Sequence, residues 1–534
     1  MSTKQFVGFG LGIVSFLVLV SVDPPSDMNP LAMKAAAVSI MMAMFWVTEA
    51  ISIFATSFLP IVLFPLLGVL DSKQIAASYG HHIVLLILGA FFVAKAIETN
   101  NLHKRIALAT IKSIGTSRPK VMLSFMIATG FLSMWTSNNS TTLMMLPIGL
   151  AILSREKELG ADTQRFAPAL MLSIAYSASI GGTGTLVGTP PNLVFVSTAQ
   201  ELLPNSPDVL FTDWLKIGIP FVLIFLPISW AYLVRFFGVS GDLQGSRTVI
   251  QKEYTALGGM SGAERKVLVV VILYALGFIF RDWWSTLLGV NGFVKDSTVA
   301  FLAAVALFSL PSGRINKDGA EERLLEWEDA KEIPWAIAML IGGGLAIASA
   351  FKSSGLVEWI GQNLLLDGIP ILLIVIAVVA AMVFLTEINS NTATTAVFLP
   401  VLAGVSDAGN FHPFLLMVPA TIAASCAFML PSGTGPNASV LATLTGNSLP
   451  AKINSTGNQM LVHFTSDNIV NKAGWEAVYT GIIPVTGGGN GNFCSGTMTY
   501  NTPSGAFSDG SGSSDYAPNS DCKWLISPAN ALPE

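Results

Sequence analysis

Long apolar runs separated by short polar loops constrain this chain more than any other feature. Residues 6–22, 35–53, 54–70 and 83–97 hold at most one charged side chain each, and each approaches or meets the roughly 17–25 apolar residues that cross a bilayer as a helix. Only 11% of the 534 residues are charged, against about 25% in soluble domains. The sequence therefore predicts an all-α polytopic membrane protein, integral to the plasma or inner membrane.

Loop charge predicts the orientation, because loops rich in Lys and Arg stay on the cytoplasmic side. Residues 100–120 carry five basic side chains and no acid, whereas residues 200–213 carry three acids and no base. This pattern predicts a cytoplasmic N-terminus. The net charge of −5 is spread over the loops and indicates no nucleic-acid partner.

Two polar motifs interrupt the apolar runs, and the second repeats the first. They read Ser133-Met-Trp-Thr-Ser-Asn-Asn-Ser-Thr-Thr and Thr386-Glu-Ile-Asn-Ser-Asn-Thr-Ala-Thr-Thr. Each is followed by a glycine-containing break in an apolar segment, Gly188-Thr-Pro-Pro-Asn and Gly433-Thr-Gly-Pro-Asn. Polar groups and freed backbone at membrane depth are costly unless they line a cavity or are buried in protein. The duplication is typical of a secondary transporter built from repeats.

The motifs predict two repeats, at about residues 34–237 and 264–445, within a transporter domain of residues 1–445. In each repeat a re-entrant hairpin (119–153 and 369–404) carries the polar motif at its tip, and a broken helix (166–198 and 412–445) follows. Equivalent loops, 100–120 and 351–369, are predicted to face opposite sides of the membrane. The repeats are therefore predicted to be inverted.

The polar residues predict two cages lined by oxygen atoms. The first comprises Ser133, Ser137, Asn138 and Gly188, and the second comprises Thr386, Ser390, Asn391 and Gly433. Uncharged oxygen ligands suit a monovalent hard cation better than Ca²⁺ or Mg²⁺, whose sites normally include Asp or Glu. We therefore expect sodium. Neither motif contains Lys or Arg, so the charge of a bound dianion would be offset mainly by these cations.

Two other interpretations of the same residues are open. Ser, Thr and Asn in membrane helices often serve only helix packing, through hydrogen bonds worth about 0.6 kcal/mol on average. Glu49 and Glu387 are ionisable groups in apolar surroundings and are candidate proton carriers. The first alternative has to explain two motifs with matching partners, which packing alone does not require.

The combined pattern resembles the divalent-anion:sodium symporter family, the carriers of dicarboxylates, citrate and sulfate, whose hallmark is two Ser-Asn-Thr motifs at hairpin tips. Supporting segments are Phe45-Trp-Val-Thr-Glu-Ala-Ile51, Ile333-Pro-Trp335 before Gly342-Gly-Gly344, and Ser425-Cys-Ala-Phe-Met-Leu-Pro431. The resemblance covers roughly residues 30–445. It implies a homodimer in which a transport domain slides through a fixed scaffold, an elevator mechanism.

The resemblance also implies a set of substrate-binding residues. They are Ser137, Asn138, Asn139, Thr189, Ser390, Asn391, Thr392 and Thr434. Two positions depart from the family pattern: the first motif reads Ser-Asn-Asn, and Gly435 stands where proline is expected. The identity of the anion is what these departures put in question.

The composition changes to Gly, Ser, Asn, Thr and Asp from about Gly446, and no later run is long enough to span a bilayer. Segments 460–468 and 474–479 resemble the end of a CUB domain, an extracellular β-sandwich, and the surroundings of Cys494 and Cys522 resemble the start of another. We expect residues 446–534 to be an incomplete CUB-like segment of β type. It is either a fusion in place of the last transmembrane helix or an extracellular binding module.

The predicted function is sodium-coupled symport of a small divalent anion, with C4-dicarboxylates such as succinate, malate or fumarate favoured. Sulfate is the alternative within transporters, and a membrane-anchored binding protein that uses the CUB-like segment is the alternative from another class. No enzymatic activity and no organic cofactor are expected. Membrane lipid is expected as the surrounding partner.

Overall fold

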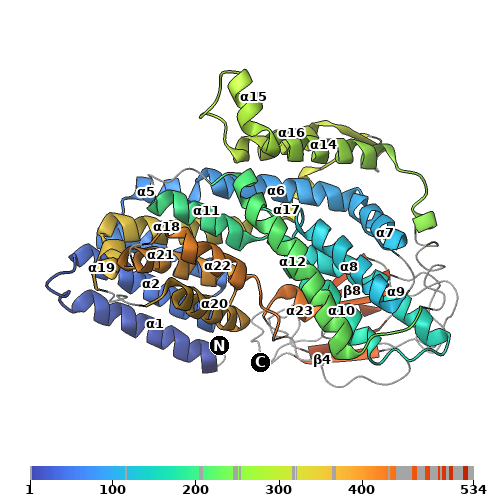
Figure 1. Ribbon diagram of the computed structural model, residues 1–534, viewed down its shortest axis with the longest axis horizontal. Helices are drawn as coiled ribbons and strands as arrows, with labels where there is room; N and C mark the ends of the chain where they lie inside the picture. Colours follow the sequence, from blue (N-terminus) through green and yellow to red (C-terminus); the bar gives the residue numbers. More distant parts are fainter. Residues whose placement is uncertain are drawn as a thin grey trace. The chain divides into compact units, whose positions relative to one another are not determined.

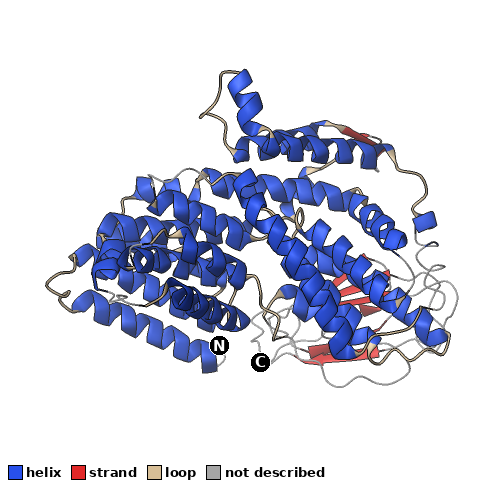
Figure 2. Cartoon of the chain, viewed as in Figure 1, coloured by secondary structure: helices blue, strands red, loops and turns tan. Residues whose placement is uncertain are grey.

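The computed structural model describes residues 3–114, 117–203, 209–243, 251, 254–315, 319, 321–363, 369–409, 411–430 and 433–439, and several short strands beyond them. The chain forms two compact units. One comprises Phe9–Thr443, and the other combines Met1–Gly8 with Leu444–Glu534. Helices make up most of the first unit (Figure 2).

The first half of the chain is a series of helices joined by short loops (Figure 1). They are α1 (Thr3–Ser21), α2 (Pro30–Thr48), α3 (Ile53–Thr56), α4 (Leu59–Leu67), α5 (Ser72–Tyr79), α6 (His82–Thr99), α7 (Leu102–Ile114), α8 (Arg118–Ser133), α9 (Asn138–Glu158), α10 (Phe166–Gly182), α11 (Pro190–Leu202) and α12 (Phe211–Phe237).

The second half repeats this order from α6 onward, after a bent helix pair and a short β-hairpin. Its elements are α14 (Gly262–Ile279), α15 (Arg281–Leu287), α16 (Asp296–Ser309), β1 (Pro311–Ile315), β2 (Glu321–Arg323), α17 (Trp327–Lys331), α18 (Trp335–Ser354), α19 (Leu356–Asn363), α20 (Ile371–Ile388), α21 (Asn391–Ala408), α22 (Phe414–Ala424) and α23 (Gly435–Ser439).

The predicted all-α polytopic membrane fold is confirmed. Six of the described helical segments are long and apolar enough to cross a membrane, and a seventh counts if α14 and α15, bent by 81°, form one span. The predicted hairpins correspond to α8 with α9 and α20 with α21, and the predicted broken helices to α10 with α11 and α22 with α23. The order of elements therefore repeats as the motifs predicted.

The hydrophobic core of this unit has two main parts. One gathers α2, α6, α14, α16, α18 and the helices of the second repeat, and its largest buried side chains include Trp46, Phe64 and Trp214. The other gathers α7, α8, α9, α10 and the end of α12 around Phe125 and Phe166. Each repeat thus contributes its hairpin to a different apolar cluster.

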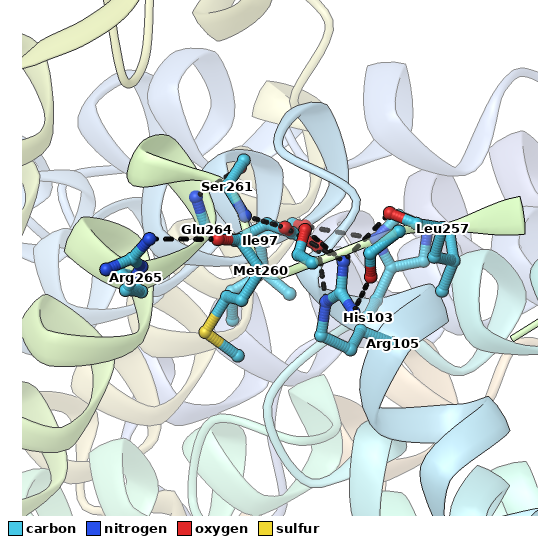
Figure 3. Close-up of polar contacts among 10 residues, drawn as sticks. Ile97, His103, Arg105, Leu257, Met260, Ser261, Glu264 and Arg265 are labelled. Atoms are coloured by element: carbon cyan, nitrogen blue, oxygen red, sulfur yellow. Dashed lines mark hydrogen bonds and ion pairs between the residues drawn. The ribbon is translucent and has the colours of Figure 1, made fainter. Parts of the chain in front are cut away.

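Helix α7 is fastened to the start of α14 by a buried ion pair (Figure 3). The Arg105 side chain, 9% exposed, donates to Glu264 Oε1 at 2.8 Å and to Oε2 at 3.1 Å. It also donates to the backbone carbonyls of Leu257, Gly258 and Gly259 at 3.1–3.2 Å. The hydrogen bonds to Glu264 raise the pKa of Arg105 above its usual value.

Helix α19 occupies the place of α7 in the second repeat, and its anchor is lighter. Trp359 Nε1 donates to Asp27 Oδ2 at 3.1 Å, and Asn363 Nδ2 donates to the same oxygen at 3.0 Å. Arg105 and Trp359 are each the fourth residue of their helix. The two helices are therefore held at equivalent points by an acidic side chain. Glu264, in the first turn of α14, holds α7, and Asp27, just before α2, holds α19.

The C-terminal part contains strands, as the predicted β-type segment requires. β3 (Met460–Thr465) pairs antiparallel with β8 (Asp521–Ile526), which pairs parallel with β6 (Gly496–Tyr500). β7 (Ser504–Ser508) lies between β4 (Glu476–Thr480) and β5 (Gly491–Asn492). Cys494 and much of the CUB-like segments lie outside the described residues. The boundary at residue 445 stays a prediction.

Candidate functional site

The first hairpin tip brings a hydroxyl, an amide and a helix carbonyl together. Ser133 is the last residue of α8, and its Oγ lies 2.7 Å from Asn138 Oδ1 and 2.7 Å from the carbonyl oxygen of Ala178 on α10. Ser133 is fully buried. Three residues from three helices thus form a compact group of oxygen atoms between hairpin and broken helix.

The second hairpin tip has the same arrangement with a different residue. Thr386 Oγ1 lies 2.6 Å from Asn391 Oδ1 and 2.7 Å from the carbonyl oxygen of Ala424 on α22. Thr386 is also fully buried. Serine and threonine therefore place their hydroxyls in equivalent positions, and four of the eight predicted cage residues lie in these two groups.

Gly188 and Gly433 occupy the helix breaks where a side chain has no room. A Cβ at Gly188 would overlap the Gly182 carbonyl and lie 3.0 Å from the carbonyl oxygen of Ser133. A Cβ at Gly433 would lie 2.6 Å from Glu387 Oε2. Each glycine thus brings its backbone against the hairpin of its own repeat.

Asn192 and Asn437 stabilise the two helix breaks, a role that the sequence motifs did not predict. Asn192 Nδ2 donates to the carbonyls of Gly182 at 3.2 Å and Thr185 at 2.7 Å. Asn437 Nδ2 donates to the carbonyls of Ala427 at 2.9 Å and Leu430 at 3.0 Å. The repeated Gly-Thr-x-Pro-Asn pattern is the signal that could have found them.

Glu387 makes the second half-site different from the first. Its carboxylate is buried and accepts the backbone N–H groups of Met429 at 2.8 Å and Leu430 at 2.7 Å. The equivalent residue of the first motif is Met134, whose side chain packs against Gly184. The residues predicted for the first half-site are therefore all uncharged, whereas the carboxylate of Glu387 borders the second half-site.

The remaining predicted residues lie in or beside the first turns of the helices that start at the site. Ser137 is the N-cap of α9 and accepts the Ser140 N–H at 3.1 Å. Thr189 precedes α11, Thr392 lies in the first turn of α21, and both are buried. Ser390 precedes Asn391, the first residue of α21. Thr434 Oγ1 accepts the Asn437 N–H at 3.3 Å.

These helix starts give the site its electrostatic character. α9, α11 and α21 all begin there, so the positive ends of their dipoles favour an anion. α11 begins with Pro190 and Pro191, which have no backbone N–H, so backbone donors come from α9 and α21 alone. The carbonyl, hydroxyl and amide oxygens of the same segments favour a cation. The two halves also meet directly, because α23 packs against α9 and α10, and the Tyr176 hydroxyl donates to the Phe428 carbonyl at 2.6 Å.

Comparison with known proteins gives matches over most of the chain. The family described as "Sodium:sulfate symporter transmembrane region" matches residues 3–449, and the CUB domain family matches residues 427–479. The "Sodium-dependent dicarboxylate transporter SdcS" of Staphylococcus saprophyticus is 41% identical over 449 residues, which cover 82% of this chain and 85% of the relative.

A second relative and a solved structure show the extent of the similarity. The protein of the same name from Staphylococcus aureus strain MRSA252 is 41% identical over 447 residues, with the same coverage. The structure titled "Structure and Function of Neisseria gonorrhoeae MtrF Illuminates a Class of Antimetabolite Efflux Pumps" is similar to 83% of this chain and 90% of its own, at 12% identity and a TM-score of 0.49.

Proposed function

The chain belongs to the sodium:sulfate symporter family, a family of transporters rather than enzymes, and we propose that it is a sodium-coupled symporter of small dicarboxylates. C4 compounds such as succinate, malate and fumarate are the favoured substrates. The names of the SdcS relatives support sodium and dicarboxylate together.

The observation that carries this proposal is the repeated hydroxyl–amide–carbonyl group. Ser133 with Asn138, and Thr386 with Asn391, have the same contacts in both repeats. Packing alone does not require two such groups at equivalent helix breaks. A pair of cation sites beside helix N-termini does require them, since an anion bound at those termini needs counter-charge.

Sodium would be held by residues of the two half-sites. The proposed ligands are Ser133, Ser137, Asn138 and Gly188 in the first, and Thr386, Ser390, Asn391 and Gly433 in the second. The Glu387 carboxylate, next to Gly433, adds negative charge that favours a cation in the second half-site. No organic cofactor is part of the proposal.

The substrate carboxylates would be bound where the helices start. The proposed residues are Ser137, Asn138, Asn139, Thr189, Ser390, Asn391, Thr392 and Thr434. Donors on these side chains and the first N–H groups of α9 and α21 would supply hydrogen bonds to an anion without any Lys or Arg, and α11, which begins with two prolines, would contribute its dipole. The charge of the dianion then depends on the co-bound sodium ions.

Movement of the two hairpins relative to a fixed scaffold, within a homodimer, completes the proposal. It rests on the family resemblance, which implies a transport domain that carries both motifs and slides through the scaffold. A cytoplasmic N-terminus and a boundary near residue 445 between the transporter and a CUB-like segment belong to the same proposal.

The test is uptake of labelled succinate into proteoliposomes with and without an inward sodium gradient. We expect uptake only with the gradient, and loss of it in Asn138→Ala and in Asn391→Ala, while both variants keep the size-exclusion profile of the unaltered protein. Undiminished uptake by both variants would contradict the binding role of the two motifs.

Sulfate is the second candidate substrate, since the family description names it. Unlabelled sulfate added in excess to the same assay separates the two. Inhibition by unlabelled succinate but not by sulfate supports the dicarboxylate, whereas sodium-driven uptake of labelled sulfate alone supports the alternative.

The CUB match is the observation behind a different candidate, an extracellular binding role for the C-terminal segment. Protease accessibility of the segment on intact cells tests it. Cleavage from outside is expected for a binding module, and complete protection contradicts that role.

A further inference from the structure

Two residues that depart from the repeat pattern touch each other across the site. Asn139 lies in the first turn of α9, and Gly435 is the first residue of α23. A Cβ added at Gly435 would overlap the side-chain amide of Asn139, with the Cγ and Nδ2 atoms at 2.5 Å. Only a glycine at position 435 is compatible with this position of the amide.

The other repeat shows what these two residues replace. The residue equivalent to Asn139 is Thr392 in the second motif, and the residue equivalent to Gly435 is Pro190 in the first break. Pro190 begins α11, which packs against α21, the helix of Thr392. The second hairpin and the first break therefore carry Thr and Pro, whereas the first hairpin and the second break carry Asn and Gly.

Relative to the other repeat, the hairpin residue Asn139 is larger and the break residue Gly435 is smaller. Asn139 has a longer polar side chain than threonine, and Gly435 lacks the ring that Pro190 carries. Both Asn139 and Gly435 are exposed, so the amide is accessible to a solute although it lies against α23. Substitution at only one of the two positions would leave either a clash or a gap.

We propose that Asn139 and Gly435 form a matched pair that determines substrate specificity. This inference rests on the proposed transport function and deepens it. Gly435 leaves the space in which the Asn139 amide lies, at the junction of the two half-sites. The Nδ2 group then offers a donor to a carboxylate of the substrate, farther from its own backbone than a threonine hydroxyl reaches.

A double-mutant cycle tests the pairing. Gly435→Ala is expected to displace the amide and raise the apparent KM for succinate about tenfold, the size of one lost hydrogen bond to a charged group. Because the displaced atoms belong to a side chain, maximal uptake and folding are expected to change little. Gly262→Ala is the matched control, since Gly262 also begins a helix and a Cβ there meets nothing within 4 Å.

The reciprocal variants decide between pairing and independent effects. Gly435→Pro alone is expected to raise the apparent KM, and Asn139→Thr with Gly435→Pro to restore succinate uptake that the single Gly435→Pro variant has lost. Additive effects of the two substitutions, or an unchanged KM in Gly435→Ala, would overturn the proposal.

Thermal melting in detergent separates this inference from the transport function. The unaltered chain, Asn139→Thr, Gly435→Pro and the double variant are melted with sodium and succinate present and absent. If the unaltered chain takes up no succinate, the proposed function fails, yet the melting temperatures still report the coupling: non-additive shifts support the pair, and additive shifts refute it.

Discussion

At the scale of single residues, the hydroxyls of Ser133 and Thr386 are the most informative groups. Each lies within 2.7 Å of two oxygens, an amide Oδ1 and a backbone carbonyl. A hydroxyl has one proton and can donate to only one of them. The other oxygen then faces a lone pair of the hydroxyl with no proton between them. A bound cation would stabilise that arrangement.

Replacing Thr386 by valine should therefore weaken sodium binding specifically. Valine has nearly the same shape but no oxygen, so we expect about a tenfold increase in the sodium concentration for half-maximal succinate uptake, corresponding to ~1.4 kcal/mol. Thr386→Ser should keep the unaltered value.

Thr421→Val is the control for this substitution, because Thr421 is also buried and its hydroxyl donates only within α22, to Met417. Equal sodium dependence of Thr386→Val and Thr421→Val would exclude a direct role of the Thr386 hydroxyl.

Burial of His103 gives a second prediction at this scale. Burial lowers the pKa of His103, while an unfolded histidine has a pKa of about 6.5. The neutral ring is thus favoured by folding, and stability should be full above about pH 6.5 and fall as the pH drops below it. Melting between pH 5 and 8 measures this loss. It should shrink in His103→Gln, and an identical pH profile would refute the assignment.

At the scale of elements, one buried polar cluster fastens α7 to the start of α14. Breaking a buried ion pair by removing one partner typically costs ~3–5 kcal/mol, because the other charge stays buried. Arg105→Ala removes the cationic partner of Glu264, whose carboxylate keeps the Ser261 N–H as a donor, and it removes the Arg105 donor of three carbonyls. We expect a clear fall in melting temperature.

Arg314→Ala is the matched control, since the side chains of its pair with Glu322 are 42% and 33% exposed and surface pairs contribute ~0–1 kcal/mol. Similar shifts for Arg105→Ala and Arg314→Ala would mean that the buried cluster does not hold α7 in place.

The sequence predicted elements better than contacts between them. Matching polar motifs located both hairpins and both broken helices, because apolar periodicity and Gly-Pro breaks are local signals. The bracing role of Asn192 and Asn437, the carboxylate of Glu387 beside Gly433, and the contact of Asn139 with Gly435 depend on residues far apart in the chain. Local pattern carries no information on which of those side chains meet.

At the scale of the whole molecule, the two repeats have the same order of helices but different side chains at equivalent positions. Ser133 is equivalent to Thr386, Met134 to Glu387, and Asn139 to Thr392. The half-sites thus share a hydroxyl–amide–carbonyl group but differ in charge and in side-chain size. The Phe9–Thr443 unit contains both halves, so a dianion bound between them in the proposed symporter would meet two different surroundings.

The equivalent helices α7 and α19 are held by anchors with unequal numbers of hydrogen bonds. If the two repeats were identical, the states open to either side of the membrane would have equal free energy. Arg105 makes five hydrogen bonds in a buried cluster, whereas Asp27 receives two at an exposed loop. In the proposed symporter, a step that loosens α7 would therefore cost more free energy than the equivalent step at α19, and the two sides of the membrane would not be equivalent.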